Sequence, residues 1–111
     1  MDARLPAHLE ISGLIRAAEA AGGFATVLSR GERDAGVVLI LTRERDRSSR
    51  LWERMPQLDG SREFTCTREE NTENKEEFFQ YVKRRGEQDP DAWVLELENV
   101  NFERLVGNHG Y

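Results

Sequence analysis

The chain has a single cysteine, Cys66, among its 111 residues. One cysteine excludes an internal disulfide, and a free thiol is typical of a reducing compartment. Cys66 lies in the alternating run Phe64–Thr67, so we expect it to be a small, half-buried strand residue. A catalytic thiol needs a nearby base, and only His8 and His109 could supply an imidazole. We therefore predict that Cys66 is not a nucleophile.

The chain also lacks a long hydrophobic run. The longest aliphatic stretch is Val37–Leu41, far short of the ~20 residues needed to span a bilayer. The segment Met1–Pro6 lacks the basic beginning and the apolar stretch of a signal peptide. We expect a cytoplasmic protein with no membrane partner.

Negative charge exceeds positive charge, and histidine is scarce. The net charge is -5 and the pI is about 5.1, whereas nucleic-acid binding depends on clustered cations. Residues 43–54 hold five arginines against three acids, a surplus too small to predict a nucleic-acid partner. No second histidine or cysteine stands at ligand spacing from His8, so we expect no metal. A glycine-rich phosphate loop and a nucleophile elbow are missing, so we expect no cofactor and no catalytic residue.

What the chain does have is a pair of β-like segments near its middle. Phe24–Arg30 alternates between large apolar and smaller residues, and Val37–Leu41 is unbroken, branched and aliphatic. The intervening segment, Gly31–Gly36, is bounded by two glycines. This pattern predicts a β-hairpin at the heart of a sheet.

The remaining patterns predict three helices and three further strands. The helices are expected from Pro6 to Gly22–Gly23, from Asn71 or Thr72 to Gly86, and after Asn101. The strands are expected at Leu51–Met55, Arg62–Thr67 and Trp93–Glu98. We predict one α+β domain over residues 1–111, with a two-layer, mostly antiparallel sheet. In this prediction four strands form a meander, a fifth joins them, and the helices pack on one face.

Several stretches resemble a family of small bacterial proteins that is catalogued only as a domain of unknown function, numbered 1491. These stretches are Leu5–Glu10, Gly22–Ala25, Arg30–Gly36, Glu53–Gly60, Thr72–Phe78 and Arg84–Trp93. The resemblance spans nearly the whole chain and implies a small stand-alone bacterial protein. It implies no activity, cofactor or catalytic residue.

Two groups of residues are candidates for binding. Arg33 and Asp34 lie at the tip of the expected hairpin, which is either a recognition loop or a solvated turn whose Asp34 accepts local N–H groups. Trp52, Glu53 and Arg54 alternate charged and large apolar side chains within one strand. If the outer sheet face is uncovered, Trp52 beside Arg54 could anchor a partner. Equally, Trp52 could complete a small apolar cluster.

We expect a non-catalytic module that binds another protein or a second copy of itself. Its sheet has edges that must be covered or paired, so an edge strand or the Trp52 face could form the interface. The alternative is a small enzyme or ligand-binding protein that holds a small molecule on the outer sheet face. Its polar groups would be Arg33, Asp34, Glu53 and Arg54, which would have to converge in a concave pocket.

Overall fold

The computed structural model describes residues 5–44 and 48–107, so residues 45–47 of the arginine-rich segment, and His109, lie outside the described residues. The elements in chain order are α1 (Ala7–Ala20), β1 (Phe24–Ser29), β2 (Val38–Arg43), β3 (Arg50–Pro56), β4 (Arg62–Glu69), α2 (Lys75–Gln88), β5 (Trp93–Glu98) and α3 (Phe102–Gly107). Each helix and strand expected from the sequence is present. None of the described helices combines the length and apolarity of a membrane span.

The strands form one sheet in the order β1-β5-β2-β3-β4. β5 is antiparallel to β1 and parallel to β2, and the other pairings are antiparallel. The predicted α+β class with a mostly antiparallel sheet is therefore confirmed. The predicted hairpin of β1 and β2 is wrong, and so is the four-strand meander, because β5 lies between β1 and β2.

The connection 30–37 explains this difference. It crosses the end of β5, where the Glu32 N–H donates to the Asp91 carbonyl at 2.9 Å. Gly31 and Gly36 pass so close to Asp91 that a Cβ on either would overlap the Asp91 carbonyl oxygen. The two glycines thus permit a close crossing rather than a tight turn. The aliphatic run of β2 is buried on both faces, as parallel neighbours usually are.

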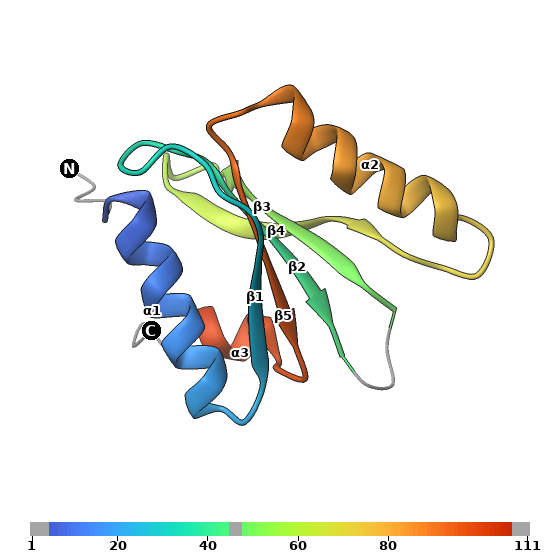
Figure 1. Cartoon of the computed structure of the whole chain (residues 1–111), viewed down its shortest axis with the longest axis horizontal. Coiled ribbons are helices and arrows are strands. Elements are labelled where there is room, and N and C mark those ends of the chain that lie inside the picture. Colours follow the sequence, from blue (N-terminus) through green and yellow to red (C-terminus); the bar gives the residue numbers. More distant parts are fainter. Residues whose placement is uncertain (1–4, 45–47, 108–111) are drawn as a thin grey trace.

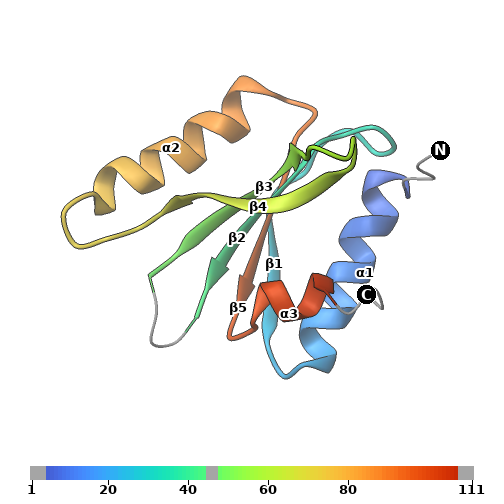
Figure 2. The same cartoon turned by 180° about the vertical axis from the view of Figure 1, so that it is seen from behind.

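The helices cover both faces of the sheet, so the prediction that they share one face is wrong. α1 and α3 pack on one side and α2 on the other (Figures 1 and 2). Side chains of β5 alternate between the two cores: Trp93, Leu95 and Leu97 face α1, whereas Val94 faces α2. Each face therefore has an apolar core of its own.

Two predicted helix ends are confirmed. Gly22 ends α1 with a positive φ of 86°, and its N–H donates to the Glu19 carbonyl at 3.0 Å. Asn101 caps α3, because its side-chain oxygen accepts the Arg104 N–H at 2.9 Å.

α2 departs from the prediction at both ends. It begins at Lys75, and Asn71 instead holds the preceding turn by accepting the Asn74 N–H at 2.9 Å. The helix continues past Gly86 to Gln88. A Cβ on Gly86 would lie 3.3 Å from a methyl carbon of Val94, so this glycine brings α2 close to β5.

Candidate functional site

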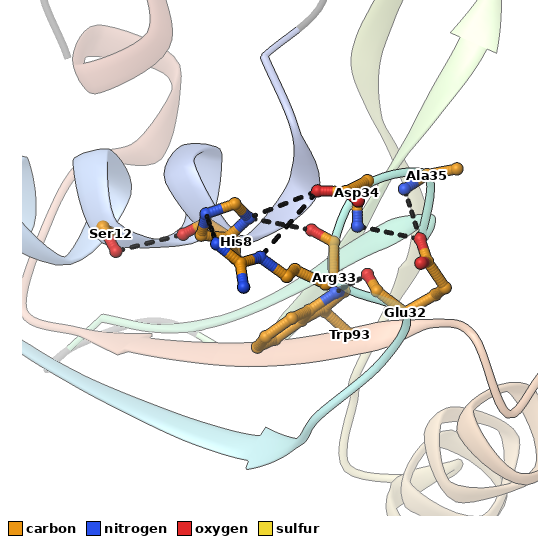
Figure 3. A network of polar contacts seen from close by, with 7 residues as sticks. All are labelled: His8, Ser12, Glu32, Arg33, Asp34, Ala35 and Trp93. Atoms are coloured by element: carbon orange, nitrogen blue, oxygen red, sulfur yellow. Dashed lines mark hydrogen bonds and ion pairs between the residues drawn. The ribbon is translucent and has the colours of Figure 1, made fainter.

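The connection 30–37, which carries Arg33 and Asp34, is fixed against the first turn of α1. The Ala7 N–H donates to the Asp34 carbonyl at 2.9 Å, and the His8 N–H donates to the Arg33 carbonyl at 2.8 Å. These two donors belong to the helix N-terminus and have no partner within the helix. The connection therefore supplies hydrogen-bond acceptors for the first turn of α1, and the same bonds hold the connection in place (Figure 3).

Glu32 holds the same loop from the other side. Its carbonyl accepts the indole N–H of Trp93 at 2.7 Å. Its carboxylate accepts the N–H groups of Asp34 at 2.8 Å and Ala35 at 2.5 Å, and these bonds lower the pKa of Glu32. The expectation that Asp34 accepts the local N–H groups is wrong, because the Glu32 carboxylate takes that place.

His8 contacts Arg33 through both ring nitrogens. Nδ1 lies 3.1 Å from the Arg33 carbonyl oxygen and Nε2 lies 3.5 Å from Arg33 Nη2. A neutral imidazole with its proton on Nδ1 satisfies both contacts, donating to the carbonyl and accepting from the guanidinium. Asp34 Oδ1 lies 3.8 Å from His8 Nδ1 and 3.9 Å from Arg33 Nε. The Arg33 and Asp34 side chains are 75% and 68% exposed, so their ion pair is weak.

A pocket of about 270 Å³ opens beside this network. It is lined by His8, Arg30, Gly31, Arg33 and Trp93. The Arg30 guanidinium carbon lies 5.7 Å from the centre of the Trp93 ring. The structure thus groups Arg33 with Arg30 and His8.

Trp52 is a core residue. It is 7% exposed, its indole N–H donates to Thr42 Oγ1 at 2.9 Å, and its ring centre lies 5.2 Å from that of Phe102. Of the two interpretations of Trp52, the apolar cluster is confirmed and the exposed anchor is wrong. α3 covers this part of the sheet, so the Trp52 face is not an open surface.

Arg54 faces the same core as Trp52. Its Nη2 donates to Glu10 Oε2 at 2.6 Å, and its guanidinium carbon lies 4.4 Å from the centre of the Phe64 ring. Glu10 is only 4% exposed. Arg54 thus ties β3 to α1.

Glu53 points to the opposite face, as successive strand residues must. Its Oε1 accepts from Arg85 Nη2 at 2.8 Å and its Oε2 accepts from the Thr67 hydroxyl at 2.5 Å. Glu53 therefore ties β3 to α2 and β4, and it shares no pocket with Arg54. The structure does not bring Arg33, Asp34, Glu53 and Arg54 together.

We expect Glu53→Ala to lower the free energy of unfolding by about 1–2 kcal/mol, since it leaves Arg85 and Thr67 without their acceptor. The effect is smaller than for a fully buried pair because the Arg85 side chain is 29% exposed. Glu69→Ala is the matched control: Glu69 accepts from Arg50 at 2.7 Å but is 54% exposed, so a loss below about 1 kcal/mol is expected. Urea unfolding followed by circular dichroism measures both, and equal losses would contradict the role of burial.

Cys66 is a half-buried residue of β4, as predicted. Burial raises the pKa of its thiol, and its Sγ lies 3.4 Å from the Arg68 carbonyl oxygen. A raised pKa keeps the thiol protonated at neutral pH and opposes a nucleophilic role.

The two edges of the sheet differ in charge. β4 carries charged residues near both of its ends, which discourage pairing with another chain: Arg62, Glu63, Arg68 and Glu69. β1, at the other edge, has no charged residue and no proline within Phe24–Ser29. Phe24 and Leu28 are 62% and 51% exposed on it. β1 is thus the unprotected edge.

A groove of about 520 Å³ runs beside β1, between α2 and the sheet. Leu28, Leu41 and Val94 contribute apolar side chains from the sheet. Arg43 lies at its side and pairs with Glu96 at 3.2 Å. The sequence did not reveal this groove, because it exists only when α2 lies on the opposite face from α1.

Of the uncharged edge strand and the grouping of His8 with Arg33, only the first was readable from the sequence. The lack of charge in residues 24–29 is visible, and it would have marked β1 as an interaction edge. The grouping of His8 with Arg33 was not visible, because it depends on the connection crossing β5 and returning to α1.

Comparisons with known proteins agree with this fold. The family model described as "Protein of unknown function (DUF1491)" matches residues 5–107. A DUF1491 family protein from Caulobacter crescentus CB15, known from a crystal structure, is 33% identical in sequence to this chain. The two structures match with a TM-score of 0.72, over 86% of this chain and 88% of that one. A protein from A. tumefaciens solved in solution is 31% identical, with a TM-score of 0.74 and 92% of both chains covered. No curated protein matches the chain.

Proposed function

Because the chain belongs to the DUF1491 family, whose function is unknown, its own surface has to indicate its role, and we propose a non-catalytic, self-associating module. In this proposal β1 pairs with β1 of a second copy and joins two sheets into one. The observation that carries the proposal is the difference between the two edges. β4 has the charges that keep soluble proteins from pairing edge to edge, and β1 has none.

The sequence of β1 suits an antiparallel pairing with itself. With Thr26 opposite Thr26 of the second copy, Phe24 lies opposite Leu28 and Ala25 lies opposite Val27. Apolar cross-strand pairs stabilise a sheet, and no like charges meet in this register. A bulge between Val27 and Ser29 leaves Phe24–Val27 as the regular part of β1.

The same register also covers exposed apolar surface. Leu28 contributes to the groove beside α2, and Phe24, the one aromatic residue of β1, is largely exposed. In the proposed dimer, Phe24 of the second copy packs against Leu28 at the side of the groove. Burial of this surface adds a hydrophobic contribution to the backbone hydrogen bonds.

The small-molecule alternative based on Arg33, Asp34, Glu53 and Arg54 has less support. Glu53 and Arg54 lie on opposite faces, and each is engaged in an ion pair with a helix. A shared binding pocket would require all four to face one cavity.

A charge placed on each edge in turn tests the proposal. Thr26 and Thr65 are both exposed threonines within edge strands, and a lysine at position 26 would face its own copy across the dimer. We expect light scattering after gel filtration, at tens of micromolar, to give twice the monomer mass of 12.8 kDa for the wild-type chain and for Thr65→Lys. Thr26→Lys should give the monomer mass.

A wild-type chain that is strictly monomeric at this concentration would overturn the proposal. A Thr26→Lys variant that remains dimeric would show that β1 is not the interface. Thermal unfolding of both variants shows that each is folded, since an exposed substitution changes stability by only about 0.5 kcal/mol.

A further inference from the structure

The pocket between α1 and the connection 30–37 contains two arginines that lack a strong partner. Arg33 has only the weak pair with Asp34, 3.9 Å away and largely exposed. Within the described part of the chain, Arg30 has no carboxylate within ion-pair distance, and its guanidinium lies over Trp93. Arginine keeps its positive charge at any physiological pH, so both cations are permanent.

The backbone of Arg33 is held in place before any ligand arrives. Its carbonyl accepts from the backbone N–H of His8 at 2.8 Å, and the His8 ring contacts its guanidinium. The indole of Trp93 donates to the carbonyl of the preceding residue, Glu32, and the Glu32 carboxylate accepts the N–H of the following residue, Asp34 (Figure 3). A loop fixed at this many points loses little conformational entropy on binding.

We propose that this pocket binds a carboxylate group, with Arg30 and Arg33 as its cationic partners. A guanidinium presents paired N–H donors that match the two oxygens of a carboxylate. His8 acts as a positioning residue, because its ring contacts both the carbonyl and the guanidinium of Arg33. The proposal is independent of the dimer, since no residue of β1 lines the pocket.

The local charge favours a single negative charge on the ligand. The two arginines contribute +2 and the nearby Asp34 carboxylate contributes -1, which leaves +1. The Glu32 carboxylate is also negative, but it is directed to the N–H groups of Asp34 and Ala35 and does not line the pocket. A carboxylate carries the one charge that balances this sum, whereas a phosphate dianion would leave an excess.

The size of the pocket narrows the ligand further. Its volume of about 270 Å³ is below the ~300–1,000 Å³ of sites that enclose drug-sized molecules. It fits a small free carboxylate or the terminal carboxylate of a peptide. These two sources share the chemistry that the arginines recognise.

The two tryptophans allow a direct test by NMR. The indole N–H of Trp93 bonds to the Glu32 carbonyl beside the pocket, whereas that of Trp52 bonds to Thr42 in the core. We expect butyrate, added to the full chain at low salt, to shift the Trp93 indole signal in a saturable way and to leave the Trp52 signal unmoved. Butyramide, its uncharged counterpart, should cause no such shift.

Variants locate the site. Arg30→Ala and Arg33→Ala should each weaken butyrate binding by about tenfold, which corresponds to the loss of one charge-assisted contact of about 1.4 kcal/mol. Arg62→Ala on β4 is the matched control and should bind as the wild-type chain does. Thermal unfolding confirms that the variants are folded, as expected for side chains on the surface.

To separate a peptide terminus from a small free carboxylate, the affinity of trialanine with a free C-terminus is compared with that of butyrate. Trialanine with an amidated C-terminus is the control that lacks the carboxylate. Tighter binding of the free-acid peptide than of butyrate indicates a peptide terminus, and the reverse indicates a small molecule. The proposal is overturned if butyrate produces no saturable shift, if butyramide matches it, or if Arg33→Ala binds unchanged. Tighter binding of inorganic phosphate than of butyrate would also overturn it, because the charge balance would be wrong.

Discussion

Trp52→Ala is expected to lower the free energy of unfolding by about 3–5 kcal/mol, the usual cost of removing a large aromatic side chain from a core. Trp52 is 7% exposed and packs against Phe102, which is 2% exposed. The substitution leaves a cavity between β3 and α3 and deprives Thr42 of its buried donor. Chemical unfolding followed by circular dichroism measures the loss.

Leu58→Ala is the control for this experiment. Leu58 lies in the turn between β3 and β4 and is fully exposed, so its removal should change stability by no more than about 0.5 kcal/mol. A loss below about 1 kcal/mol for Trp52→Ala would contradict the assignment of Trp52 to the core. It would restore the interpretation of this residue as a surface anchor.

Gly31→Ala is expected to cost about 3 kcal/mol, although it adds a single methyl group. The new Cβ would overlap the Asp91 carbonyl oxygen and would lie 2.6 Å from the Ala92 carbonyl carbon. Both obstacles are backbone atoms of the turn just before β5, so neither can turn aside as a flexible side chain could. Overpacking of this kind typically costs 1–3 kcal/mol, and the rigid backbone places Gly31 at the upper end of that range.

Gly107→Ala provides the comparison, because nothing lies within 4 Å of the position its Cβ would take. At the end of α3, alanine should leave stability unchanged or raise it slightly, since alanine favours the helix over glycine. Melting temperatures of the two variants test the difference. Equal temperatures would mean that the connection 30–37 does not press against β5.

The sequence located the elements well, because each carries a local signal. Alternation marked β5, and the paired glycines after α1 marked its end through the positive φ of Gly22. These signals depend on a few neighbouring residues. They are readable without knowledge of the rest of the fold.

The sequence did not determine how the strands associate. Gly31 and Gly36 were interpreted as the ends of a hairpin turn, whereas they allow the chain to pass over β5. The unbroken run in Val38–Leu41 was the stronger clue, because a strand buried on both faces requires a neighbour on each side and a helix on each face. The unbroken apolar run therefore argues against helices on one face only and favours helices on both faces of the sheet.

The candidate residues show the same limit. The alternation in β3 places Glu53 and Arg54 on opposite faces, so the alternative that set both on the outer sheet face was wrong. The sequence could not show what covers either face. Arg33 was singled out from its place in a loop, and that choice remains a prediction. Its grouping with Arg30 and His8 arises from contacts between segments that are distant along the chain, for which a single sequence gives no signal.

The place of β5 between β1 and β2 has a consequence for biosynthesis. Phe24 pairs with Glu98, so the first strand to leave the ribosome must wait for the fifth before it gains its neighbour. During that interval β1 is bare on both sides and β2 is bare on one. Synthesis proceeds from the N-terminus, and pairing across such a long separation is slow. The nascent chain therefore passes through a stage in which its least charged strand is most open to unwanted association. Pairing with β5 then covers one of the two sides of that strand.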